Sequence, residues 1–233
     1  MSISKMYLDV VAGMESFKED AEFLSDLMTL ARIMSEIKWT EPPDSVGWNK
    51  YIVGDGKKAI DKHIGICFEQ TAALAHMWKD EIKSEIPITA VFGRQFNGDE
   101  YWGDHSDLII LKSPTEVYIA APLDRKDRIR RYPSLDVLMK EELEHRVISA
   151  ANARLRNTLG FSQYMLKLKE QVKAMNIDHI DIELSLYDPL DKTLYNKYTI
   201  DEFGNHIIKK YGLYKPTEDF SKVKIEGVET IIE

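Results

Sequence analysis

The chain is poor in cysteine, glycine and proline, and it lacks long apolar runs. Its 233 residues include one Cys, 12 Gly and 8 Pro, which excludes a disulfide framework, a Cys-based zinc cage and collagen-like or low-complexity structure. No run approaches the roughly 18 apolar residues that a membrane-spanning helix requires. Before Met14 the apolar stretch is short and is broken by Asp9, so we expect no secretory signal. These absences predict a globular, cytoplasmic protein that is not attached to a membrane.

Positive charge is in deficit, because 31 Lys and Arg face 39 Asp and Glu, for a formal net charge of −8. This balance argues against a protein that coats nucleic acid or an anionic membrane. One basic cluster, residues 125–131, could bind a phosphate, a nucleotide-bearing cofactor or an acidic partner, or could simply pair with nearby glutamates such as Glu141 and Glu142. Asp178, Asp181 and Glu183 lack the Gly and terminal Glu of a calcium loop. We therefore expect neither a metal nor a cofactor.

What the chain does contain is a succession of helical and strand-like apolar patterns. A helix is expected at 16–39, a short basic helix at 57–62, and a third helix that begins near Cys67. Strands follow at 86–93, 108–111 and 117–121, then helices at 134–153 and 160–175, a strand at 180–187 and a helix at 200–211. The order predicts an α+β fold in which the Cys67 helix packs on an antiparallel sheet. We expect a core over residues 1–125 and a mostly helical C-terminal extension or subdomain over 126–233.

Cys67 carries the most chemical information in the sequence. It follows Gly65 and Ile66 and opens a helix, so its thiol faces the positive end of the helix dipole, which favours the thiolate. Backbone N–H groups at the same end can bind an oxyanion. These are the local needs of a nucleophilic cysteine, although a lone cysteine often only fills a core.

A thiol nucleophile also needs a base, and His105 is the best placed of the six histidines. We expect it at the mouth of the strand 108–111, after a loop containing residues 102–104, where it could reach the Cys67 sulfur. His76 lies on the Cys67 helix but about 13 Å further along its axis. The remaining histidines precede the Gly turn or lie in the C-terminal half: His63, His145, His179 and His206.

Residues 58–74, with Gly65-Ile66-Cys67 opening a helix of small and apolar residues, resemble the nucleophile segment of the transglutaminase-like and papain-like cysteine enzymes. The strand at 86–93, His105 with the strand at 108–111, and the strand at 117–121 are similar to the order of elements in that superfamily. The resemblance covers residues 51–124, about a third of the chain. It implies a Cys-His-Asp site that transfers acyl groups through a thioester.

The sequence departs from this pattern at the orienting acid. The superfamily carries an aspartate at the end of the third strand, where this chain has Ala121 before Pro122. Such an acid holds the histidine tautomer and stabilises its cation. Asp124, Asp107 or Asn97 could substitute, and we expect Asp124, because a bulge could bring it to the vacant place.

Residues 65–70 are also similar to the cysteine motif of arylamine N-acetyltransferases. That family has Arg-Gly-Gly before its cysteine, whereas this chain has His63, Ile64 and Gly65, and the strand end at 120–124 also differs. An acyl-CoA-dependent transferase of this type is therefore an alternative.

The expected function is that of a thiol-dependent amide hydrolase or acyltransferase, of the cysteine protease, glutamine deamidase or transglutaminase type. Cys67, His105 and Asp124 would act on a protein or peptide substrate, with activity weakened by Ala121. The alternative from another class is a non-catalytic protein-binding module that keeps the same scaffold. The sequence leaves the acyl acceptor and the oligomeric state open.

Overall fold

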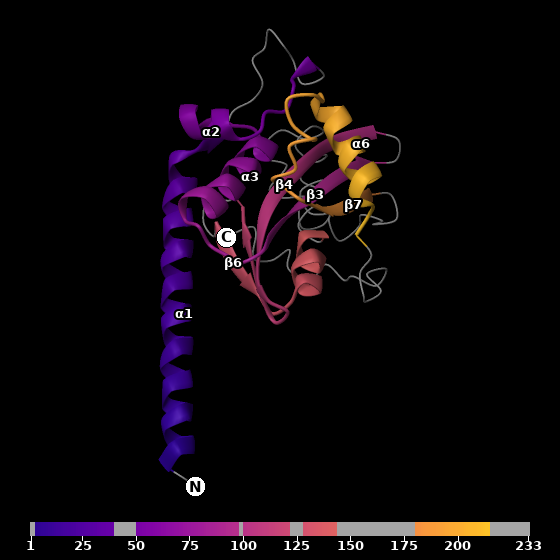
Figure 1. Cartoon of the computed structure of the whole chain (residues 1–233). Helices are drawn as coiled ribbons and strands as arrows, with labels where there is room; N and C mark the ends of the chain where they lie inside the picture. Colours follow the sequence, from indigo (N-terminus) through magenta and orange to yellow (C-terminus); the bar gives the residue numbers. More distant parts are fainter. Residues whose placement is uncertain (1–2, 40–49, 98–99, 122–127, 144–179, 215–233) are drawn as a thin grey trace, which may run out of the picture.

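A computed structural model describes residues 3–39, 50–97, 100–121, 128–143 and 180–214. Its centre is a five-stranded antiparallel sheet with the strand order β6-β5-β4-β3-β7 (Figure 1). Two short strands, β1 and β2, pair in parallel beside it. The described strands are β1 (Lys38–Trp39), β2 (Ile64–Gly65), β3 (Ile88–Asn97), β4 (Glu100–Ser113), β5 (Glu116–Ala120), β6 (Ile129–Tyr132) and β7 (Ile180–Tyr187). The predicted α+β class is confirmed.

The helices cover both faces of this sheet. They are α1 (Ile3–Glu36), α2 (Lys57–Lys62), α3 (Cys67–His76) with a π-helical continuation at Met77–Glu81, and α6 (Ile200–Tyr211); residues 135–143 are also helical. None of the described helices is both long enough and apolar enough to cross a membrane.

The core has three parts that follow from the alternation of strand side chains. Leu108 and Ile110 of β4 pack with α1 and α3, around the buried Trp78. Ile109, between them, points to the opposite face and packs with the helical residues 135–143. A third cluster joins α3 to α6 through the rings of Phe68 and Phe203, whose centroids are 4.9 Å apart.

Several predicted elements have the expected bounds, and others are longer than predicted. The helices at 57–62 and 200–211 and the strand at 180–187 are confirmed. The first helix begins at Ile3 rather than at residue 16. The segment 102–104, predicted as a loop, belongs to β4, because β3 continues to pair with it as far as Asn97.

The sheet continues across the predicted boundary at residue 125. β6 pairs with β5 and β7 pairs with β3, so two strands from the part expected to be mostly helical complete the two edges of the sheet. The predicted helix at 134–153 is helical over residues 135–143, and its remainder and the predicted helix at 160–175 lie outside the described residues.

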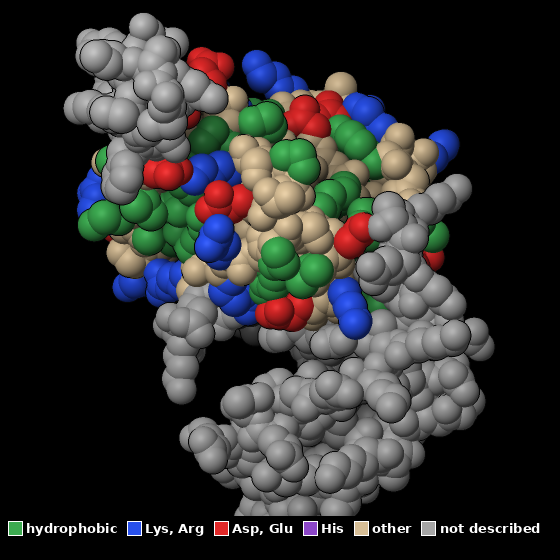
Figure 2. Space-filling model, turned by 90° about the horizontal axis from the view of Figure 1, so that it is seen from below, with side chains coloured by type: hydrophobic (Ala, Val, Ile, Leu, Met, Phe, Trp, Pro, Cys, Tyr) green, Lys and Arg blue, Asp and Glu red, His purple; other side chains and the backbone are tan. Residues whose placement is uncertain are grey.

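The described charges are mixed rather than segregated. On the face seen in Figure 2, Lys and Arg side chains are interspersed with Asp and Glu and with hydrophobic groups. Within the basic cluster, Arg130 pairs with Glu142 at 3.4 Å and Arg131 pairs with Glu116 at 3.0 Å. Two of the three described arginines of the cluster are therefore paired with acids, and residues 125–127 lie outside the described residues.

Candidate functional site

Cys67 is the first residue of α3, and a buried carboxylate fixes the backbone around it. Glu69 accepts hydrogen bonds from the backbone N–H of Ile66 at 3.2 Å and of Gly54 at 2.9 Å, and from the Tyr51 hydroxyl at 2.9 Å. Burial, followed by the Glu69 charge, raises the pKa of Tyr51 well above its ordinary value, so the phenol remains a donor. This network holds the first turn of α3 and places the Cys67 thiol at the helix start.

Glycines allow this close approach. A Cβ atom at Gly54 would lie 2.9 Å from Oε1 of Glu69, and one at Gly65 would lie 3.2 Å from the Cβ of Glu69. The glycine before Cys67 is thus explained by packing against the carboxylate that caps the helix.

α3 lies along an edge of β4 that β5 does not cover. The last register pair between β4 and β5 is Leu108 with Ala120. Beyond it, the Thr71 hydroxyl donates to the carbonyl of Ser106 at 3.0 Å, and the Cys67 sulfur lies 4.0 Å from the carbonyl of Asp104. Four helical residues rise about 6 Å and two strand residues rise about 6.6 Å. The rise of one turn of α3 is therefore about equal to the spacing between the carbonyls of Asp104 and Ser106 along the open edge of β4.

His105 lies between those two carbonyls and joins the thiol to an acid. Its Nε2 lies 3.2 Å from Oδ1 and 3.1 Å from Oδ2 of Asp107, and the Cys67 side chain lies near enough to raise the pKa of the imidazole. With Nε2 engaged by the carboxylate, Nδ1 is the ring nitrogen left for the sulfur. Cys67, His105 and Asp107 are thus neighbours in this order, and the His105 side chain is 27% exposed while that of Asp107 is 4% exposed.

The electrostatics favour a protonated His105. Burial lowers its pKa, but the neighbouring Asp107 and Cys67 outweigh burial and raise the pKa to about 10. A pKa raised in this way favours the protonated imidazole at neutral pH, which could donate a proton from Nδ1.

Among the described residues, Asp107 is the acid that contacts His105. Side chains two residues apart on a strand point to the same side of the sheet, which explains why Asp107 contacts His105. One step beyond the Leu108–Ala120 register, Ala121 would face Asp107 across the ladder. The expected acid, Asp124, lies outside the described residues, as does the side chain of Asn97.

A second buried ion pair holds β4 next to the site. Arg94 of β3 binds both carboxylate oxygens of Asp104, each at 2.8 Å. Its remaining donors reach α6, where Nη1 lies 2.5 Å from Oδ1 of Asn205 and Nη2 lies 3.3 Å from the carbonyl of Asp201. A Cβ atom at Gly204 would come within 2.3 Å of Nη2 of Arg94. This pair fixes the backbone that carries both the Asp104 carbonyl and His105.

Gln70 is the functional candidate that sequence reasoning missed. It is 1% exposed, and among the described residues neither its Nε2 nor its Oε1 has a hydrogen-bond partner. It stands three residues after Cys67 on α3, so their Cβ atoms are neighbours about 5–6 Å apart. Helical side chains also lean toward the N-terminus, which brings this amide toward the thiol.

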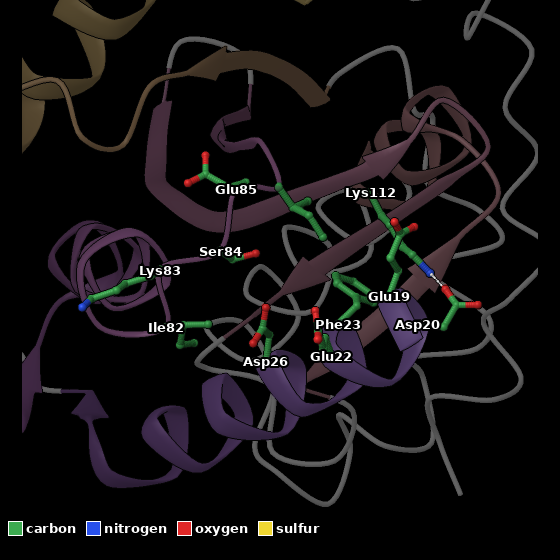
Figure 3. A pocket seen from close by; sticks show the side chains of 11 residues that line it. Glu19, Asp20, Glu22, Phe23, Asp26, Ile82, Lys83, Ser84, Glu85 and Lys112 are labelled. Carbon is green, nitrogen blue, oxygen red and sulfur yellow. Dashed lines mark hydrogen bonds and ion pairs between the residues drawn. The ribbon is translucent and has the colours of Figure 1, made fainter. Parts of the chain in front are cut away.

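A separate hollow lies between α1 and the segment 82–86 (Figure 3). It has a volume of about 630 Å³ and is lined mainly by charged side chains, with Lys112 bonded to Asp20 at 2.6 Å at one end. None of the residues around Cys67 lines it. Among the described residues, no group of three His, Cys, Asp or Glu side chains could hold a metal ion.

Comparison with known proteins found no matching family model, no matching curated protein and no matching solved structure.

Proposed function

We propose that the protein is a thiol-dependent acyl-transfer enzyme that acts on an amide of a protein or peptide through a Cys67 thioester. The observation that carries this proposal is the grouping of Cys67, His105 and Asp107 at the start of a helix, with His105 hydrogen-bonded to Asp107 and next to Cys67. The order of elements that resembles the transglutaminase-like and papain-like enzymes supports the same reading. In this proposal Asp107 takes the orienting role that the sequence assigned to Asp124.

The chemistry follows from the charge state of the pair. The Cys67 thiolate attacks the amide carbonyl carbon, and backbone N–H groups in the first turn of α3 stabilise the resulting oxyanion. The His105 imidazolium then donates its Nδ1 proton to the leaving amine as the carbon–nitrogen bond breaks. Asp107 stabilises the imidazolium until that transfer.

The second half of the reaction regenerates the thiolate. His105, now neutral, accepts a proton from the acyl acceptor as its oxygen or nitrogen attacks the thioester carbonyl. Water as the acceptor gives a protease or deamidase, and an amine gives a transglutaminase or N-acyltransferase. We favour water, and therefore an amide hydrolase or deamidase.

Alkylation of the folded protein by iodoacetamide tests the activated thiol directly. Cys67 is the only cysteine, so the mass of the intact protein reports on this one site without a known substrate. A thiolate paired with His105 should label fast at about pH 6, well below the free-thiol range of about 8.5, and the pairing should persist until His105 loses its proton near pH 10.

The protein unfolded in denaturant supplies the matched control, because it carries the same cysteine without the site. Labelling of the folded protein that rises only above about pH 8, as for a free thiol, would overturn the proposal and favour a binding module.

Acyl transfer itself is tested with p-nitrophenyl acetate, which needs no specificity. The expected result is a burst of nitrophenolate with one acetyl group on Cys67, followed by slow release. Cys67→Ser should abolish the burst. Adding a primary amine or coenzyme A distinguishes the acceptors, and faster turnover with either would replace the hydrolase assignment by a transferase one.

A further inference from the structure

Helix α1 is apolar on two separate faces. One face lies against the sheet and α3, and its residues are buried: Phe23, Leu27, Leu30, Met34 and Ile37. On the other face, Leu24 is 57% exposed and Met28 is 75% exposed, and Ala21 is also exposed. At 100° per residue the centres of these two faces are about 140° apart. Among the described residues, the second face is therefore largely uncovered at Leu24 and Met28.

The sequence of α1 continues the exposed face through the whole helix. Apolar residues recur at alternating steps of four and three, which is the a/d spacing of a coiled coil. We call these nine positions the outer stripe: Ile3, Tyr7, Val10, Met14, Phe17, Ala21, Leu24, Met28 and Ala31. It spans four heptads without one charged residue, in a helix about 51 Å long.

We propose that the outer stripe is the interface of a homodimer in which two copies of α1 pack antiparallel. An interface that a protein makes with itself must be self-complementary about a two-fold axis. With the axis beside residue 19, each position i from Tyr7 to Ala31 faces position 38 − i of the partner, and Ile3 lies beyond the paired positions. Large residues then face small ones: Phe17 faces Ala21 and Tyr7 faces Ala31.

The other pairs in this register are also apolar, since Met14 faces Leu24 and Val10 faces Met28. In a parallel pair, by contrast, Phe17 would face Phe17 and Ala21 would face Ala21, which alternates crowding with gaps. The volumes along the stripe therefore favour the antiparallel arrangement.

The size and the position of the stripe both suit a dimer. A large apolar side chain removes roughly 60–120 Å² from water, so two stripes bury on the order of 1,000–2,000 Å², the range of stable interfaces. The N-terminal half of α1 runs beyond the sheet (Figure 1). Because the domain packs on the other face of α1, it does not obstruct a partner helix.

Sedimentation of the full chain at about 1–100 µM tests the proposal. We expect a dimer, and we expect Met28→Glu to raise its dissociation constant about 100-fold or more, because each glutamate would be buried unpaired in the seam. Thr29→Glu, the neighbouring substitution outside the stripe, should leave the dimer intact. Met28 is exposed in the domain, so circular dichroism should show that Met28→Glu remains folded.

The orientation is tested by oxidative cross-linking in the Cys67→Ser background. Val10→Cys with Met28→Cys should form an intermolecular disulfide, because the two positions face each other. Met28→Cys alone should not, since the two copies of residue 28 lie about 27 Å apart in this register. A monomeric wild type, an unaffected Met28→Glu dimer, or cross-linking by Met28→Cys alone would each overturn the proposed antiparallel dimer.

Discussion

Two carboxylates three residues apart on β4 each hold a cationic partner, and they do so in opposite ways. Asp104 faces Arg94 in a bidentate pair whose side chains are 0% and 7% exposed, and the spare donors of Arg94 are taken by α6. Asp107 uses one nitrogen of His105, whose side chain remains 27% exposed and next to Cys67. All the charged groups of the Arg94–Asp104 pair serve to hold the fold together. The Asp107–His105 pair leaves a proton on His105 that can be transferred beside the Cys67 nucleophile.

Removing the structural cation should have the largest effect on stability. Arg94→Met leaves Asp104 buried without its partner, so we expect a loss of about 3–5 kcal/mol in the free energy of unfolding by urea denaturation. Arg32→Met is the control, because Arg32 pairs with Glu36 on the surface, where a pair contributes about 0–1 kcal/mol. Equal losses in the two variants would show that the buried pair does not hold the fold.

Removing the proton carrier should lower the reactivity of the Cys67 thiol. His105→Ala should slow alkylation of Cys67 near neutral pH by about 100-fold, the lower range of a general acid–base contribution. His76→Ala is the matched control, since His76 lies on the same helix and pairs with Asp80 at the surface. An unchanged alkylation rate in His105→Ala would show that His105 does not act on the Cys67 thiol, and the proposed dyad would be wrong.

Removing Asp107 should slow alkylation of Cys67 less than removing His105, and an aspartate placed at the end of β5 should restore the rate. Asp107→Ala should slow alkylation about 10-fold, corresponding to about one pKa unit of lost imidazolium stabilisation. Adding Ala121→Asp to this variant should restore most of the rate, because position 121 faces position 107 in the continued register. A double variant as slow as Asp107→Ala would show that only the β4 position can orient His105.

The smallest expected effect concerns Gln70, a buried polar side chain without a hydrogen-bond partner among the described residues. Gln70→Leu removes an unsatisfied amide from the interior, so we expect a gain of about 1 kcal/mol in unfolding free energy. Alkylation by a small reagent should be unchanged, whereas acylation by a peptide ester should fall if the amide binds the substrate backbone. A loss of stability would contradict the unsatisfied state of this amide.

The sequence predicted the elements whose ends carry local signals. Helix α6 begins at Thr199, whose backbone N–H and hydroxyl bind Glu202 at 3.0 Å, and ends at Gly212. Such caps are visible in a sequence. Cys67 at the start of α3 was predicted for the same reason, because Gly65 and the apolar run mark that helix.

Elements held by distant partners could not be predicted in the same way. Gly103 and Asp104 are typical of a loop, but pairing with β3 and the Arg94 ion pair keep them in β4. Strand β6 was hidden in a basic cluster whose arginines meet acids from other elements. The misplaced start of β4 also left Asp107 as only one of three candidates for the orienting residue. With His105 expected before the strand rather than within it, the spacing of two residues did not indicate that both side chains point to the same side.

The short length of β5 has a consequence for how the site could be altered. Because the ladder stops at Leu108 and Ala120, the carbonyls of Asp104 and Ser106 are occupied by side chains of α3 rather than by another strand. Lengthening β5 would therefore put strand and helix in competition for the same acceptors. A series of insertions of increasing length after Ala120 should therefore abolish the reactivity of the Cys67 thiol at the length at which the added strand displaces α3.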